Sequence, residues 1–207
     1  PPQPGAAEDY RLVIAPALFS LSDTLVESFG ENGQIVLAGP RAGSRTPDFA
    51  IPDALPPGDA LQKHLAIKVR RSETLRPPAQ IDIGEPANRF AFETWREFVV
   101  AGDVETIDRM ADGEIAFCAD KTGRFHYLAG DPNAAYAGRI VGYLCGKAGV
   151  RTQRLHRDLR IRDNGPTRYI FNYGPEPVDI SHLVDGAPLL IGSTELGPCG
   201  IAAFRRG

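Results

Sequence analysis

One turn carries the strongest chemical pattern in the chain, the frame G-P-R-A-G at residues 39–43, which follows a short apolar run. Small residues around a central one are typical of a nucleophile elbow, a strained turn after a strand that exposes a serine or cysteine. The central residue here is Arg41, and a guanidinium only donates hydrogen bonds and cannot attack a carbonyl group. We therefore interpret the turn as structural, or as an interface where Arg41 and Arg45 would bind a carboxylate or another anion.

The histidines and cysteines lack the partners that catalysis or metal binding requires. His126 lies in the middle of an expected strand, so we interpret it as a core or sheet-surface residue, and the four histidines show no ligand spacing. The three cysteines form no C-x-x-C pair, which favours a reduced, cytoplasmic protein. We expect Cys118 and Cys145 to be buried and Cys199 to lie in a turn before the last strand. No metal or cofactor is predicted.

Carboxylates and aromatic side chains gather on one expected strand. A retaining glycosidase holds two carboxylates at a fixed separation across a cleft. Glu93 and Glu97 instead share one face of a single strand, so we expect both to lie on a solvated strand edge. Four aromatic residues have the spacing of core or interface residues, although such rings could also form a platform for a sugar: Phe90, Phe92, Trp95 and Phe98.

The elements that position the turn form a β-α-β pattern. Two apolar runs, at residues 12–15 and 34–38, flank a helical pattern that Ser22-Asp23 caps and that Gly30 and Gly33 close. Both runs are continuous rather than alternating, which predicts parallel strands buried on both faces. Ligands gather beyond the carboxyl ends of such strands, where residues 16–19 and 39–46 lie.

The segment at residues 40–59 is long, polar and rich in proline. Loops of this length inside a domain are usually functional or part of an interface. Because it contains Phe49 and Ile51, we expect it to pack against another surface.

The remainder of the chain predicts more strands than helices. After a short helix at residues 60–65, strand patterns occur at residues 67–75, 81–83, 89–100, 105–110, 113–119 and 123–129. A helix then begins at Asp131-Pro132, with Asp131 as its cap, and ends at Gly149. Its expected apolar face comprises Ala135, Ile140, Val141 and Leu144.

Only short strands are expected beyond residue 152, at residues 159–162, 168–173, 178–180, 189–191 and 201–204, with Asn164-Gly165 and Asp185-Gly186 as turns. The sequence therefore predicts an α/β domain over residues 1–150. A small antiparallel β domain follows over residues 151–207.

Length and charge restrict the function classes. The chain has 207 residues, 43% of them hydrophobic, and a net charge of −3, which gives no reason to expect binding to nucleic acid or to an anionic membrane. No apolar run is long enough to span a bilayer. The chain opens with PPQPGAAEDY and enters a strand at once, so we expect it to be part of a longer protein, with earlier strands missing from this sheet.

The order of these segments is similar to the C-terminal half of the β-galactosidases of glycoside hydrolase family 42. The segments that carry the resemblance span nearly the whole chain: LAGPRAGSRTPDFAIPDALPPG, KVRRSETLRP, GRFHYLAGDPNAAYAGRIVGYLCGKAGV, RYIFNYGPEPVDI and LGPCGIAAFRR. In one place the chain departs from the family, because Cys199 stands where the family usually has an aromatic residue.

The resemblance implies a trimerisation domain over residues 1–150, with a flavodoxin-like fold related to the class I glutamine amidotransferases, and a C-terminal β domain over residues 151–207. It also implies a homotrimer whose catalytic TIM barrel lies outside this chain. That barrel would carry two glutamates that hydrolyse terminal β-D-galactosides with retention. No catalytic residue of the family falls within this chain.

We predict that the subunit contact lies in the proline-rich segment, at Arg41, Ser44, Arg45, Asp48 and Phe49. Two other functions remain open on the sequence alone.

The first alternative is a standalone carbohydrate-binding module that uses the sugar platform of Phe90, Phe92 and Trp95. The second is an amidotransferase-like hydrolase, which would need a nucleophile where Arg41 stands.

If the basic residues of the turn hold subunits together, reversing their charge should weaken the oligomer. We expect Arg41→Glu or Arg45→Glu to shift the native mass from three chains towards one, as measured by native mass spectrometry. An unchanged native mass in both variants would contradict the predicted contact.

Overall fold

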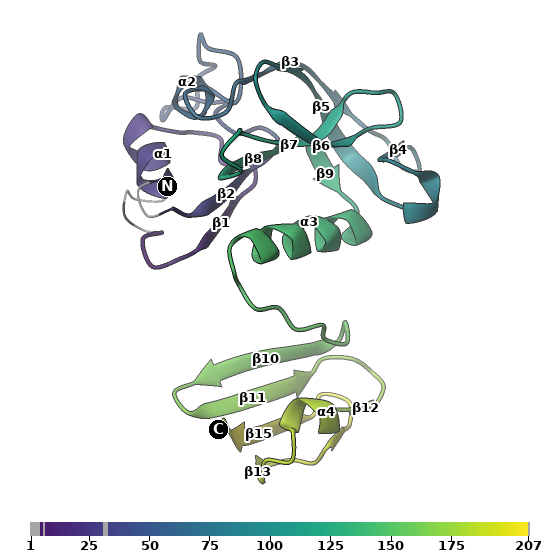
Figure 1. The fold of residues 1–207 in the computed structure, drawn as a ribbon. Coiled ribbons are helices and arrows are strands. Elements are labelled where there is room, and N and C mark those ends of the chain that lie inside the picture. The colour runs from purple at the N-terminus through teal and green to yellow at the C-terminus, as the bar shows by residue number, and fades with distance from the viewer. Residues whose placement is uncertain (1–4, 6, 31–32, 207) are drawn as a thin grey trace. The chain divides into compact units, whose positions relative to one another are not determined.

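The computed structural model describes residues 5, 7–30 and 33–206, which form two compact units, Pro1–Thr152 and Gln153–Gly207 (Figure 1). Within the described residues, no helix has the length and apolar character needed to cross a membrane.

The first unit contains a mixed sheet. Its strands are, in spatial order, β1 (Leu12–Ala15), β2 (Ile35–Ala38), β8 (Phe125–Leu128), β7 (Ile115–Ala119) and β6 (Glu105–Arg109). Neighbours among β1, β2 and β8 pair in parallel, whereas β7 is antiparallel to both β8 and β6.

The predicted β-α-β unit is confirmed, with helix α1 (Asp23–Gly30) between β1 and β2. The prediction that both strands are buried on both faces is wrong for β1. This strand lies at the sheet edge and pairs only with β2 among the described strands, so Ile14 is 44% exposed. Strand β2 has a neighbour on each side, and Val36, Leu37 and Ala38 are buried.

A second sheet of the same unit is built around one long strand. It comprises β3 (Ile67–Thr74), β5 (Ala91–Ala101), β4 (Ile81–Asp82) and β9 (Gly130–Pro132), and the short helical turns α2 (Asp59–Gln62) and η1 (Pro86–Asn88) precede β3 and β5. Strand β5 pairs with the other three strands. One hydrophobic core includes residues of both sheets.

Helix α3 (Ala134–Lys147) begins later than predicted. Asn133 is its cap, because its side-chain oxygen accepts the backbone N–H of Tyr136 at 2.9 Å. Asp131 is not the cap, since Asp131 and Pro132 belong to β9 and pair with β5. Gly149 follows the helix with a φ of +63°, as expected of a helix stop.

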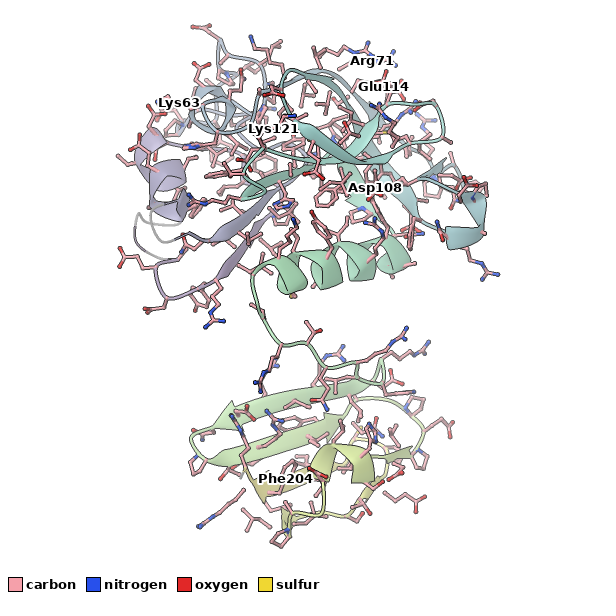
Figure 2. The ribbon with its side chains drawn as sticks, in the orientation of Figure 1. Lys63, Arg71, Asp108, Glu114, Lys121 and Phe204 are labelled. Atoms are coloured by element: carbon pink, nitrogen blue, oxygen red, sulfur yellow. The ribbon has the colours of Figure 1, made fainter. Side chains whose placement is uncertain are left out.

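The buried face of α3 is also rotated from the predicted one. Tyr136, Ile140, Leu144 and Cys145 are buried, whereas Ala135 and Val141 are exposed. The hydroxyl of Tyr136 donates to Asp108 of β6 at 3.0 Å, and Arg139 pairs with the same carboxylate at 2.8 Å. Asp108 is labelled in Figure 2. Tyr136 is therefore buried with its polar hydroxyl bonded to the sheet, whereas Ala135 and Val141, predicted to be buried, face away from the core.

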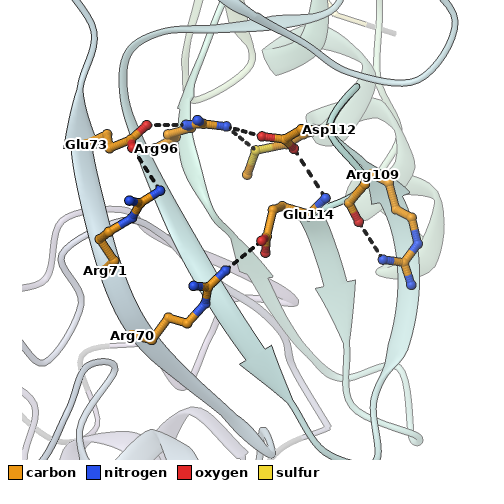
Figure 3. A network of polar contacts seen from close by, with 9 residues as sticks. Arg70, Arg71, Glu73, Arg96, Arg109, Asp112 and Glu114 are labelled. Atoms are coloured by element: carbon orange, nitrogen blue, oxygen red, sulfur yellow. Dashed lines mark hydrogen bonds and ion pairs between the residues drawn. The ribbon is translucent and has the colours of Figure 1, made fainter.

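An ion-pair network links strands β3 and β5 of the second sheet to the connection between β6 and β7 of the first (Figure 3). Arg96 of β5 pairs with Glu73 of β3 and with Asp112 in the turn between β6 and β7, and its side chain is only 12% exposed. Arg70 reaches Glu114 at 2.6 Å. Because Arg96 is largely removed from water, its pairs are screened less than those of an exposed side chain.

The second unit has its own antiparallel sheet and its own core. The sheet consists of β10 (Leu159–Asn164), β11 (Thr167–Asn172), β15 (Ile201–Arg205) and β13 (Leu189–Ile191). Helix α4 (Ser181–Val184) and the pair β12 (Val178–Asp179) and β14 (Glu195–Leu196) complete it. The sequence predicted the sheet strands and both turns. It did not predict α4, which has four residues, or β14, which has two.

Candidate functional site

The turn after β2 has the strained central residue of an elbow, although no helix follows it directly within the described residues 33–206. Arg41 adopts a φ of +68°, which a non-glycine residue rarely does. A side chain at Gly39 would place its Cβ 3.1 Å from the Cα of Pro16, and one at Gly43 would place it 1.9 Å from the carbonyl oxygen of Pro57. The small residues of the G-x-R-x-G frame are therefore required by close backbone contacts on both sides of the turn.

Backbone hydrogen bonds join the segments that follow the first two strands. The N–H of Gly43 donates to Leu18 O at 3.0 Å, and the N–H of Arg45 donates to Phe19 O at 2.9 Å. The two segments predicted to share the carboxyl edge of the sheet thus lie side by side there.

A cavity of about 480 Å³ opens at this edge. Four of the five predicted contact residues line it, namely Arg41, Ser44, Arg45 and Phe49, whereas Asp48 does not. A second hollow of about 430 Å³ adjoins it and shares three residues with it: Phe19, Arg45 and Phe49.

Glu97 of β5 lines this cavity and is only 2% exposed. Its Oε1 accepts the backbone N–H of Arg41 at 2.8 Å and Trp95 Nε1 at 3.2 Å, and its Oε2 accepts the hydroxyl of Tyr127 at 2.6 Å. Burial raises the pKa of Glu97 above its ordinary value, although these three hydrogen bonds pull it down. Glu97 is therefore the polar centre of the elbow.

The expectation that Glu97 lies on a solvated strand edge is wrong, although Glu93 is exposed. The pairing of β5 with β9 shifts register between Phe92 and Arg96, so the alternation read from the sequence is not kept along the strand. Sequence reasoning also missed the contribution of Tyr127 and Trp95 to this site. A glutamate followed by the apolar run Phe98-Val99-Val100 was the available signal.

Arg41 makes one contact through its backbone and another through its side chain. Its backbone N–H anchors the elbow to Glu97, while its guanidinium lies 4.2 Å from the centre of the Trp95 ring. Such a cation–π contact holds the side chain over the aromatic face. The position that exposes the nucleophile in an active elbow thus carries a cation here, which supplies no route to acyl transfer.

The other residues considered for chemistry have structural places. His126 is fully buried against the rings of Phe117 and Tyr143, and burial lowers its pKa, so it is a core histidine. Cys118 is buried in β7, which raises its pKa to about 12 and leaves the thiol unreactive. Cys145 is also buried, and Cys199 lies exposed in the turn before β15, as predicted.

The rings of the proposed sugar platform do not share one surface. Phe92 is fully buried, and both Phe92 and Phe90 pack against Tyr136, with ring centres 5.9 and 5.5 Å away. Only Trp95 lines the cavity. Among the residues that the structure describes, no group of three or more histidine, cysteine, aspartate or glutamate residues could hold a metal ion.

The loop beyond the elbow is ordered and yet presents apolar side chains. The N–H of Phe49 donates to Thr46 O at 2.9 Å, and the N–H of Thr46 donates to Ala50 O at 2.9 Å. Within this turn Phe49 has a φ of +63° and is 73% exposed, and Ile51 beside it is 81% exposed. Clustered apolar exposure on a fixed backbone is typical of a surface that another surface covers.

Comparison with known proteins gives a consistent result. The family model described as "Beta-galactosidase trimerisation domain" matches residues 3–151. A β-galactosidase of Thermus thermophilus is 38% identical over 203 residues, which is 97% of this chain and 30% of that protein. The chain thus spans about 30% of the length of this curated relative.

Solved structures share the fold. The β-galactosidase from the psychrophilic Marinomonas ef1 superposes with a TM-score of 0.84 at 25% identity, over 96% of this chain and 29% of the other. The β-galactosidase from the Antarctic haloarchaeon Halorubrum lacusprofundi gives a TM-score of 0.80 at 23% identity, over 95% of this chain and 31% of the other. The arrangement of mixed sheets with few helices is therefore one that these proteins have in common.

The close packing at Gly43 gives a stability prediction with a matched control. Gly43 and Gly84 have similar φ values, +61° and +64°, but a Cβ at Gly84 would meet nothing within 4 Å. We expect Gly84→Ala to cost about 1 kcal/mol, the ordinary strain of the left-handed region, and Gly43→Ala to cost more than about 3 kcal/mol because the backbone must also move. Urea unfolding followed by the fluorescence of Trp95, the single tryptophan, measures both; equal losses would contradict the packing argument.

The buried carboxylate predicts a pH dependence. The pKa of Glu97 is higher in the folded protein than its ordinary value of 4.5, so the folded state binds the proton more tightly than the unfolded state does. Glu97 therefore favours folding below pH 4.5 and loses that contribution as pH rises through its folded-state pKa.

Glu97→Gln removes this titration and keeps an oxygen that accepts from Arg41. We expect the free energy of unfolding of the variant to increase relative to that of the wild type as pH rises above 4.5, because only the wild type loses the contribution of Glu97. Glu93→Gln, at an exposed position of the same strand, should show no such change. A pH-independent difference for Glu97→Gln would contradict the raised pKa.

Proposed function

The chain belongs to the β-galactosidase trimerisation domain family, in agreement with its resemblance to glycoside hydrolase family 42, and from this we propose that it is the assembly portion of a retaining β-galactosidase. Residues 1–150 would form the trimerisation domain and residues 151–207 a small C-terminal β domain. The parallel strands β1, β2 and β8 and the elbow after β2 support a flavodoxin-like, amidotransferase-related fold for the first of these.

The activity proposed for the whole protein is the hydrolysis of terminal β-D-galactosides. The names of its relatives support this, since the similar proteins are β-galactosidases. The two catalytic glutamates would belong to a TIM barrel outside this chain. The enzyme would act in the cytoplasm as a homotrimer, and this chain would contribute contacts between subunits and with the catalytic domain.

The observation that carries the assembly role is the exposure of apolar side chains in the ordered loop beyond the elbow. Phe49 and Ile51 are 73% and 81% exposed although their turn is hydrogen-bonded. We propose that residues 40–59 form the subunit contact. Arg41, Ser44, Arg45 and Phe49 would line it, with Asp48 beside them. Aromatic residues and arginine are enriched at such contacts.

Native mass spectrometry of the chain tests this function. We expect the mass of three 22.4 kDa chains for the wild type. Ile51→Ser should weaken association roughly tenfold to a hundredfold, because burying an isoleucine is worth about 1.5–3 kcal/mol.

The matched control is Ile191→Ser, which removes a 56% exposed isoleucine of the second unit and should leave the mass unchanged. A wild-type chain that stays monomeric at high concentration would contradict the assembly role. Equal effects of the two substitutions would contradict the proposed contact but not the role.

A further inference from the structure

We infer that the subunit contact is a knob-and-hollow joint, in which Asp48 and Ile51 of one copy dock against Arg45 and the adjoining hollow of the next copy. This inference rests on the proposed function, because it takes a second copy of the chain as the partner. Asp48 and Ile51 form the knob, and the hollow is the space of about 430 Å³ next to the cavity of about 480 Å³ that Arg41 lines.

The hollow has the chemistry of a receptor for an acidic, apolar segment. Leu18, Phe19 and Leu25 give it apolar walls, and Arg45 is the one charged residue among those that line it within the described part of the chain. A guanidinium next to apolar surface favours a carboxylate whose neighbours are also apolar.

Arg45 is available for such a partner. Its side chain is exposed, and its Nη1 donates to the carbonyl oxygen of Ser44 at 3.0 Å. Across residues 5, 7–30 and 33–206 it forms no ion pair. A guanidinium has five N–H donors, so most of its hydrogen-bonding capacity is open to another molecule.

The knob supplies the complementary chemistry. Asp48 is exposed, lines neither the cavity nor the hollow of its own copy, and likewise has no ion pair among the described residues. Although Arg45 is only three positions away, the two side chains do not pair within one copy. Ile51 is 81% exposed and also lies outside both spaces. The knob therefore presents one carboxylate and one large apolar group to the solvent.

Symmetry explains why one copy carries two different surfaces. The subunits of a three-fold ring meet through two different patches, each copy offering one to the neighbour on either side. Two patches that lie close together on one copy can each meet the complementary patch of a neighbouring copy when both patches lie near the three-fold axis. Pro47 and Phe49, which flank Asp48 in the chain, both line the hollow, and the hydrogen-bonded turn at Thr46 fixes the spacing of knob and hollow.

A charge-swap series tests the joint on the whole 207-residue chain. Arg45→Glu and Asp48→Arg each place like charges across every contact, so we expect each to weaken association by about tenfold or more. The double variant, R45E with D48R, restores opposite charges at every contact. Its dissociation constant should return to within about threefold of the wild-type value. Sedimentation equilibrium gives the constants.

The controls separate charge from fold. Arg76→Glu and Glu93→Arg make the same charge changes at exposed positions outside both spaces and should leave association unchanged. Because the double variant carries both substitutions, recovery of its assembly excludes misfolding as the cause of the single effects.

The proposed joint would be overturned if the losses of affinity in the two single variants add up in the double variant. It would also be overturned if neither single substitution changes the dissociation constant. Either result would leave the assembly role intact. A monomeric wild type would overturn the proposed function itself.

Discussion

The hydrogen bonds of one buried carboxylate connect the main parts of the first unit. Glu97 of β5 belongs to the second sheet, Tyr127 of β8 to the first, and Arg41 to the turn after β2. A buried carboxylate without partners would cost several kcal/mol, and each donor that reaches it reduces that cost. The carboxylate therefore holds β5, β8 and the turn after β2 in fixed positions relative to one another, because none of them could bury it alone. A displaced elbow would leave Oε1 without its strongest donor.

This arrangement separates the shape of a catalytic elbow from its chemistry. The left-handed conformation at Arg41 and the close contacts at Gly39 and Gly43 are what an elbow needs to expose its central residue. With arginine at that position, the exposed group stacks on Trp95 and lines a cavity instead of attacking a substrate. The strain of the turn is retained because Glu97 stabilises it from the opposite side. A rigid turn with a charged tip is suited to positioning a contact.

Local patterns in the sequence predicted most elements of the fold, since their signals depend on neighbouring residues. The apolar runs predicted at residues 12–15 and 34–38 lie between turn residues, and they form the parallel strands β1 and β2 as expected. The predictions that failed depended on distant parts of the chain. Asp131 is a good cap by type, but pairing with β5 takes it into a strand, and Asn133 then caps the helix. Strand β1 reads as fully buried, yet whether a strand has one neighbour or two is set by the whole sheet.

The candidate site was predicted only in part, because some of its residues are neighbours in the sequence and others come from distant strands. Four contact residues follow one strand and therefore reach the same cavity. Glu97 and Tyr127 join it from strands far along the chain, and a register shift in β5 turns Glu97 inward. No periodicity along one strand contains that information, because a bulge changes which face every later residue takes.

Apolar residues that stay exposed do not stabilise a loop, because the unfolded loop exposes them equally, and the conformational entropy of the chain then favours the unfolded loop. Here the loop is fixed at both sides: Gly43 and Arg45 bond to the segment after β1, and Thr46 closes the turn that holds Phe49. The order of the loop thus comes from backbone contacts and from the elbow beneath it, and does not require burial of Phe49 or Ile51. These side chains are free to be buried against a partner with little further ordering entropy, which is the condition under which a small apolar contact contributes most of its burial energy to association.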